Sequence, residues 1–281
     1  MKLVHTLLFL LRPDKIAEDL ALAKLCLGSL EKSRYKAVLV YNQGPMSKVD
    51  VENFLSQFHL EITVIGDAVN VGVAQGRQQC FQYIWDNMPD TEFISELHMD
   101  MIFTDNWEDA LVDFLTSYDE PMVCPGIIDK NGNMPFSQLP ARKLPESLQD
   151  YDSFLAELSC DQILHGFNQP CVHKVEVLKA VGGYDTGFLT GKQCFEDDSL
   201  LLGYYYYYGT RADWFPKINL RSFVYHAIAL QRLDLHDNVM VNYYNLIKQY
   251  GAMGLKSLSH LHKSAWHQRF FYDRYSEYLQ K

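Results

Sequence analysis

Hydrophobic and polar residues alternate in short blocks along the first half of the chain. Apolar runs bounded by turn residues predict strands at residues 4–11, 37–41, 62–65, 92–97 and 122–124. Apolar residues at helical spacing predict helices between them, at residues 15–32, 49–58, 72–87 and 106–117. Strands that alternate with helices form a mostly parallel sheet covered on both faces. The predicted fold class is therefore α/β.

The second half of the chain is less regular. Residues 126–165 carry several prolines and the turn Asn131-Gly132-Asn133, which predicts a long loop that acts as a lid or an acceptor-binding region. Short helices are predicted at residues 175–181 and 198–208. The tail from about residue 234 is predicted to be helical. Residues 241–281 hold six basic and two acidic side chains, a net charge of +4, and many aromatic rings. This composition suits contact with a membrane surface, a homodimer or a plain packing extension.

Composition excludes several classes of protein. Hydrophobic residues make up 48% of the 281 residues, so a sizeable core is expected and global disorder is not. The net charge of −10 is unsuited to nucleic acid, whose phosphates need a basic surface. The apolar start, residues 3–11, is too short to span a bilayer and lacks the features of a signal peptide. The six cysteines are scattered without a CxxC pair, which suggests a reducing, cytoplasmic location.

Polar side chains follow the predicted strands at their carboxyl ends. Asn42 follows the second strand, Asp67 and Asn70 follow the third, and His98 and Asp100 follow the fourth. Parallel sheets bind their ligands beyond these ends. The five residues are therefore candidates for ligand binding.

Strand alternation points His98 and Asp100 in the same direction. An imidazole and a carboxylate side by side can share a divalent ion, and mixed nitrogen and oxygen ligands favour Mn²⁺ over Ca²⁺. In the alternative interpretation, the two side chains only cap the strand and the following turn.

A run of three acids, Glu196-Asp197-Asp198, opens the predicted helix near residue 198. The helix dipole favours acids at this position, so a simple N-terminal cap is one interpretation. The other is a carboxylate that acts as general base toward an acceptor hydroxyl.

Taken in order, these segments resemble the family-two glycosyltransferases and their GT-A relatives. In that family, a strand ends in an Asp-x-Asp motif that binds a metal and the nucleotide diphosphate. A Gly-Gly-Phe-Asp turn and a Glu-Asp pair that supplies the base come later. The corresponding segments here are Leu97-His98-Met99-Asp100, Val181-Gly182-Gly183-Tyr184-Asp185 and Glu196-Asp197. Two further segments resemble the family's Asn-x-Gly segment and its metal-binding histidine strand: Asn70-Val71-Gly72 and Phe223-Val224-Tyr225-His226. The resemblance covers roughly residues 3–230.

The resemblance implies a metal-dependent glycosyltransferase. It would move a sugar from a nucleotide-diphosphate sugar to a hydroxyl of an unidentified saccharide, lipid-linked or protein acceptor, with inversion. Mn²⁺ or Mg²⁺ would be held by His98, Asp100 and His226. Asp197 would be the base and Glu196 would bind the acceptor. The remaining donor contacts would come from Asn42, Asp67, Asn70, Arg77 and Asp100.

The resemblance also implies a domain organisation. A GT-A domain would span residues 1–233, with a nucleotide-binding half at 1–125 and an acceptor or catalytic half at 126–233. A helical extension would follow at 234–281.

Two alternative functions remain open. A sugar-nucleotide nucleotidyltransferase would need a basic, glycine-rich signature after the first strand, where this chain has Arg12-Pro13-Asp14-Lys15. A non-catalytic nucleotide- or carbohydrate-binding relative would fit the departures from the family motif at His98 and Asn42.

Overall fold

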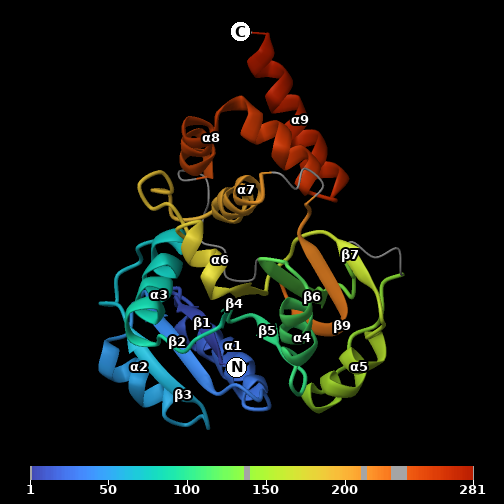
Figure 1. Ribbon diagram of the computed structural model, residues 1–281. Coiled ribbons are helices and arrows are strands. Elements are labelled where there is room, and N and C mark those ends of the chain that lie inside the picture. Colours follow the sequence, from blue (N-terminus) through green and yellow to red (C-terminus); the bar gives the residue numbers. More distant parts are fainter. Residues whose placement is uncertain (1, 136–139, 210–213, 229–238, 281) are drawn as a thin grey trace.

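A computed structural model describes residues 2–135, 140–209, 214–228 and 239–280. Its first half is a parallel sheet, as predicted, and the strand order is β3-β2-β1-β4 (Figure 1). The strands are β1 (Leu3–Phe9), β2 (Ala37–Asn42), β3 (Glu61–Ile65) and β4 (Phe93–Leu97). The connecting helices are α1 (Ile16–Leu30), α2 (Lys48–Leu55) and α3 (Val73–Asn87).

Alternation along β1 gives the sheet two apolar faces. Leu3 packs in one hydrophobic cluster with Leu27 of α1, and Val4 packs in the other with Phe81 of α3. Successive side chains of a strand point to opposite faces, so neighbouring residues of β1 enter different clusters. The predicted arrangement of helices on both faces is confirmed.

The second half adds strands of both directions. β8 (Cys171–Lys174) lies antiparallel between β4 and β6 (Met122–Ile128). β9 (Lys217–His226) runs parallel to β6 and pairs antiparallel with β5 (Met101–Ile102) and β7 (Ile163–His165). The other elements of this half are α4 (Asp109–Ser117), a short 3-10 turn (Leu148–Asp150), α5 (Tyr151–Leu158) and α6 (Val175–Ala180).

The prediction of an irregular segment over residues 126–165 is wrong at the end of β6, in α5 and in β7. β6 continues to Ile128 through a register shift at Pro125/Gly126, where the ring of Phe223 occupies the place of a Cβ on Gly126. The Pro-Gly pair therefore marks a bulge and a close approach, and the strand continues past it. α5 buries Tyr151, Leu155 and Leu158, a helical spacing that the surrounding prolines obscure.

The C-terminal helices share a core with the rest of the molecule. α7 (Glu196–Tyr207) lies between the sheet and the pair formed by α8 (Val239–Leu261) and α9 (Ala265–Leu279) (Figure 1). Leu246 and Leu258 of α8 belong to the same buried cluster as Leu201 of α7. The predicted boundary at residues 233 and 234 lies outside the described residues.

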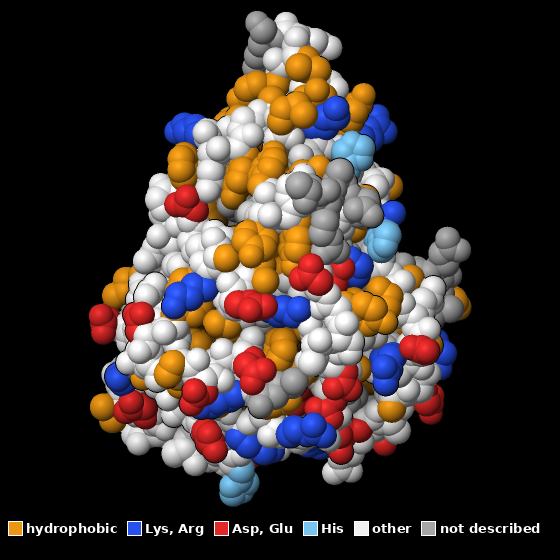
Figure 2. Space-filling model, in the orientation of Figure 1, with side chains coloured by type: hydrophobic (Ala, Val, Ile, Leu, Met, Phe, Trp, Pro, Cys, Tyr) orange, Lys and Arg blue, Asp and Glu red, His pale blue; other side chains and the backbone are white. Residues whose placement is uncertain are grey.

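The outer surface of this region carries exposed aromatic side chains. Trp266 is 65% exposed and Tyr272 is 56% exposed. Figure 2 shows hydrophobic side chains over this end of the molecule, with Lys and Arg beside them. In the part of the chain that is described, no helix has the length and apolarity needed to cross a membrane. Membrane or dimer contact through this region stays a prediction.

Leu246→Ala tests whether α8 is part of the main core. The side chain is fully buried, so its truncation should destabilise the whole protein by about 2–5 kcal/mol in denaturant unfolding, within one cooperative transition. Met253→Ala, beyond the kink of α8 at Gly251, is the control. Met253 is 55% exposed, and its variant should stay within about 0.5 kcal/mol of the native chain. A native-like main transition in Leu246→Ala, with α8 melting separately, would contradict the shared core.

Candidate metal and base site

The three predicted metal ligands meet at the carboxyl end of β4. His98 and Asp100 follow β4, and the pairing of Met101 with His226 brings the end of β9 beside them. One ligand atom from each of His98, Asp100 and His226 lies within 4.8 Å of the others. His226 Nε2 is 3.4 Å from Asp100 Oδ1, and the two imidazole centroids are 5.3 Å apart.

The side chains of this cluster suit a cation. His226 Nδ1 donates to the carbonyl oxygen of Gln169 at 3.1 Å, and its Nε2 faces Asp100 Oδ1. Burial lowers the pKa of His98 to about 3, and repulsion from His226 adds to the shift. Burial alone would raise the pKa of Asp100, but the hydrogen bond from His226 outweighs it and the pKa is lowered. Imidazole nitrogens and a carboxylate oxygen are ligands that Mn²⁺ accepts.

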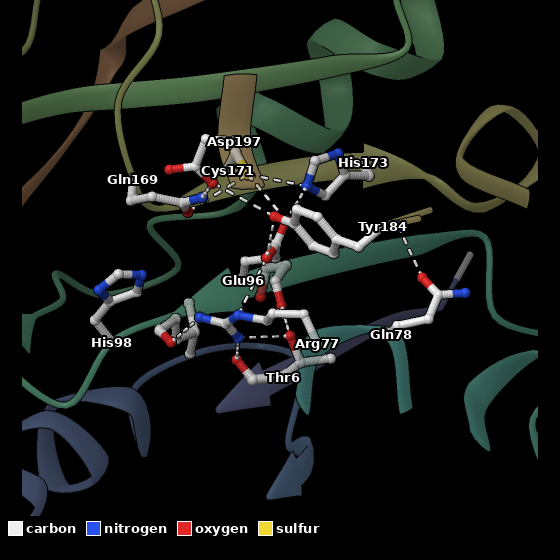
Figure 3. A network of polar contacts seen from close by, with 12 residues as sticks. Thr6, Arg77, Gln78, Glu96, His98, Gln169, Cys171, His173, Tyr184 and Asp197 are labelled. Atoms are coloured by element: carbon white, nitrogen blue, oxygen red, sulfur yellow. Dashed lines mark hydrogen bonds and ion pairs between the residues drawn. The ribbon is translucent and has the colours of Figure 1, made fainter. Parts of the chain in front are cut away.

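The second part of the site is the first turn of α7. The side-chain Nε2 of Gln169 donates to Asp197 Oδ1 at 3.1 Å, while the carbonyl of the same residue accepts from His226. Gln169 thus joins the candidate base to the candidate metal cluster. Figure 3 shows Asp197 and Gln169 above a buried polar network, with His98 to one side.

Glu96 is the centre of that network. Its carboxylate lies 3.1 Å from Arg77 Nε and 2.8 Å from His173 Nε2, and all three side chains are buried. Burial raises the pKa of Glu96, but the bond from His173 and the charge of Arg77 hold it below its usual value. The Tyr184 hydroxyl donates to Glu96 Oε2 at 2.9 Å and lies 3.4 Å from Asp197 Oδ1. The ionised carboxylate of Glu96 and the candidate base Asp197 therefore lie on either side of the Tyr184 hydroxyl.

The first two acids of α7, Glu196 and Asp197, have raised pKa values. Burial raises the pKa of Asp197 to about 7, and the charge of Glu96 adds to the effect. Burial also raises the pKa of Glu196 to about 8, together with the charge of Asp197. Oε2 of Glu196 is buried and has no hydrogen-bond partner among the described residues. The pair is therefore poised to gain or lose a proton and to bind a ligand hydroxyl.

Two of the residues predicted to contact the sugar donor are buried and bonded within the protein. Arg77 is 1% exposed, and its guanidinium is held by Glu96 and by the carbonyl oxygens of Thr6 and Leu97. Asn42 is fully buried. Its Oδ1 accepts from the backbone of Gly44 and its Nδ2 donates to the carbonyl of Met46. This side chain shapes the turn after β2, because both ends of its amide bond to local backbone.

Asp67 and Asn70, which are also predicted to contact the sugar donor, lie on the loop between β3 and α3. Asp67 is exposed. Asn70 Oδ1 accepts from Gly72 N at 2.9 Å, and its carbonyl accepts from Lys192. Their contact with a donor stays a prediction.

Gln169, Tyr184 and Glu96 also belong to the site, although no role was predicted for them from the sequence. Tyr184 stands inside the quoted Gly-Gly-Tyr-Asp segment, and Glu96 is an acid within an apolar strand, which usually signals a paired buried charge. Gln169 has no such signal, since its role depends on where β8 begins.

Comparison with known proteins supports the fold. No family model matches the chain, and no curated protein matches it. Among solved structures, S. aureus TarS aligns with 98% of the chain at a TM-score of 0.53 and 11% identity. TarS residues 1–349 in complex with UDP-GlcNAc align with 91%, at 0.52 and 12%. GalNAc-T7 with UDP, GalNAc and Mn²⁺ aligns with 88%, at 0.61 and 13%.

The chain spans 43%, 66% and 47% of the lengths of these three structures. Identities this low carry information about the fold alone. The chain therefore has the GT-A-like α/β fold that its motifs imply.

Proposed function

We propose that this protein is a glycosyltransferase that moves a sugar from a nucleotide-diphosphate sugar to an acceptor hydroxyl. The observation that carries the proposal is the link through Gln169, which holds the Asp197 carboxylate beside the His98, Asp100 and His226 cluster. A binding protein needs a site for the ligand, but it has no use for a carboxyl group with a pKa near neutrality beside that site.

The residues divide the chemistry between them. Asp197 takes the proton of the acceptor hydroxyl, Gln169 and Tyr184 orient its carboxylate, and Glu196 binds acceptor hydroxyls. His98, Asp100 and His226 would hold Mn²⁺ or Mg²⁺, which would neutralise the charge of the leaving nucleoside diphosphate. An acceptor hydroxyl that is deprotonated by Asp197 and attacks the anomeric carbon from the face opposite the leaving diphosphate would invert that centre.

The solved structures support the choice of donor and metal. The TarS complex contains UDP-GlcNAc, and the GalNAc-T7 structure contains UDP, GalNAc and Mn²⁺. A uridine nucleotide is therefore the first donor to test. We also propose a cytoplasmic location, because Cys26, Cys80, Cys124 and Cys171 are buried free thiols.

The nucleotidyltransferase alternative loses its main support. Arg12, the cation of its weak signature after β1, lies 2.6 Å from the buried Asp19. An arginine bound in this way anchors the start of α1 and is committed to a protein carboxylate.

Asp197→Asn tests the base. The amide keeps an oxygen for the bond from Gln169 but cannot accept a proton, so transfer should fall about 100-fold or more while donor binding is retained. Release of nucleoside diphosphate in the presence of acceptor, and calorimetric donor binding, are the measurements. Asp161→Asn, an exposed acid, is the control. Native donor binding without any turnover would favour the non-catalytic alternative.

Asp100→Ala tests the metal cluster. In the native chain, Mn²⁺ with a uridine diphosphate donor should raise the melting temperature more than either ligand alone, because ligands that bind only the folded state stabilise it. The metal-dependent part of this shift should vanish in the variant. Asp105→Ala removes an acid that is 70% exposed nearby and should leave the shift intact. An equal shift in Asp100→Ala would refute the assignment of this ligand.

The raised pKa of Asp197 predicts how the rate depends on pH. Only the ionised carboxylate accepts a proton, so kcat should rise with pH up to the pKa of about 7 and level off above it. The measurement is kcat at saturating donor, acceptor and metal across about pH 5 to 9. A rate that falls as pH rises through neutrality would contradict a carboxylate base at this position.

A further inference from the structure

The loop before α7 has an unfavourable backbone conformation. Cys194 has φ 72° and Phe195 has φ 62°, so two consecutive non-glycine residues lie in the left-handed region immediately before Glu196. Such residues persist only where the surrounding contacts hold them. The direction of the first turn of α7, and therefore of Asp197, depends on those contacts.

Asn242 of α8 supplies the main contacts. Its side chain is fully buried. Oδ1 accepts from Gly191 N at 2.7 Å, and Nδ2 donates to the carbonyl oxygen of Cys194 at 2.8 Å. One amide thus holds both ends of the segment 191–194. A buried amide whose donor and acceptor are both satisfied gives a rigid connection, because any movement leaves a polar group unpaired.

Further bonds from the C-terminal helices hold α7 itself. His262, just after α8, lies with Nε2 2.6 Å from Asp198 Oδ1. The hydroxyl of Tyr250 donates to the carbonyl oxygen of Ser199 at 3.2 Å. Both contacts are within two residues of Asp197. The helix turn that carries the candidate base is therefore held from the side opposite the sheet.

The same loop also contacts the nucleotide-binding half. Val73 N, at the start of α3, donates to the carbonyl oxygen of Lys192 at 2.8 Å. A Cβ on Gly72 would lie 2.9 Å from Lys192 Cα, so the two backbones touch. The loop 187–195 is clamped between α8 on one side and α3 on the other.

We propose that Asn242 is a positioning residue for sugar transfer. Through it, α8 helps to set the position of the candidate base. This inference rests on the proposed function. Asn242 fixes loop 191–194, the loop fixes Phe195 and the first turn of α7, and that turn directs Asp197 toward Gln169 and Tyr184. Asn242 makes no contact with the metal cluster in the described structure, so its loss should affect the transfer step and spare donor binding.

Asn242→Ala should lower kcat about 10- to 100-fold, since displacement of a reacting group by about 1 Å has an effect of this size. KM for the donor should stay within about threefold of the native value. Asn245→Ala is the matched control. Asn245 lies one turn along α8 and donates to Thr190 Oγ1 in the same loop, but it does not hold the segment 191–194. Native kcat in Asn242→Ala, or equal losses in both variants, would overturn the proposal.

Hydrogen exchange of the peptide covering residues 187–199 gives a readout without substrate. The Gly191 amide should exchange faster in Asn242→Ala and unchanged in Asn245→Ala. If the native chain turns over no donor, the proposed function fails, and this exchange result still decides whether the clamp exists.

If Asn242→Ala does not fold, Asn242→Asp replaces it. The carboxylate keeps the bond from Gly191 N and loses the bond to Cys194. A reduced kcat at unchanged donor KM supports the positioning role, and a native kcat overturns it.

Discussion

One buried carboxylate organises the centre of this molecule. Glu96 lies in the middle of a strand that is buried throughout, where an uncompensated charge would be very costly. Arg77 from α3 and His173 from β8 supply the compensation, and Tyr184 adds a hydroxyl. These partners come from separate parts of the sequence. The contacts that compensate the Glu96 carboxylate therefore determine how α3, β8 and the turn after α6 pack against β4.

The candidate site is built on this network. Tyr184 contacts Glu96 on one side and Asp197 on the other, which positions the candidate base. Burial raises the pKa of Asp197, and the charge of Glu96 adds to the effect. The antiparallel insertion of β8 places Gln169 between the two halves of the sheet, where its side chain meets Asp197 and its carbonyl meets His226. The candidate metal cluster and the candidate base are held in a constant relative position because Gln169 bonds to both.

The C-terminal helices complete the same structure. α8 contributes apolar side chains to the cluster that contains α7, and a buried amide to the loop that precedes it. The composition of this C-terminal region suggests attachment to a surface, but its inner face packs against α7 and the loop before it. Its outer aromatic face remains available to another surface.

The alternation of strands and helices and the parallel first half could be predicted from the sequence pattern, and the resemblance of short motifs pointed to His98, Asp100 and His226. Hydrophobic periodicity and short motifs are local signals, and local signals survive without tertiary information. The contacts of Arg77 and Asn42 became known only from the tertiary structure, since the sequence does not show that a helix arginine faces a buried acid. It also decided the roles of Gln169 and Asn242. Each is an amide whose partners lie far along the chain, and such bonds form only when the packed elements bring donor and acceptor together.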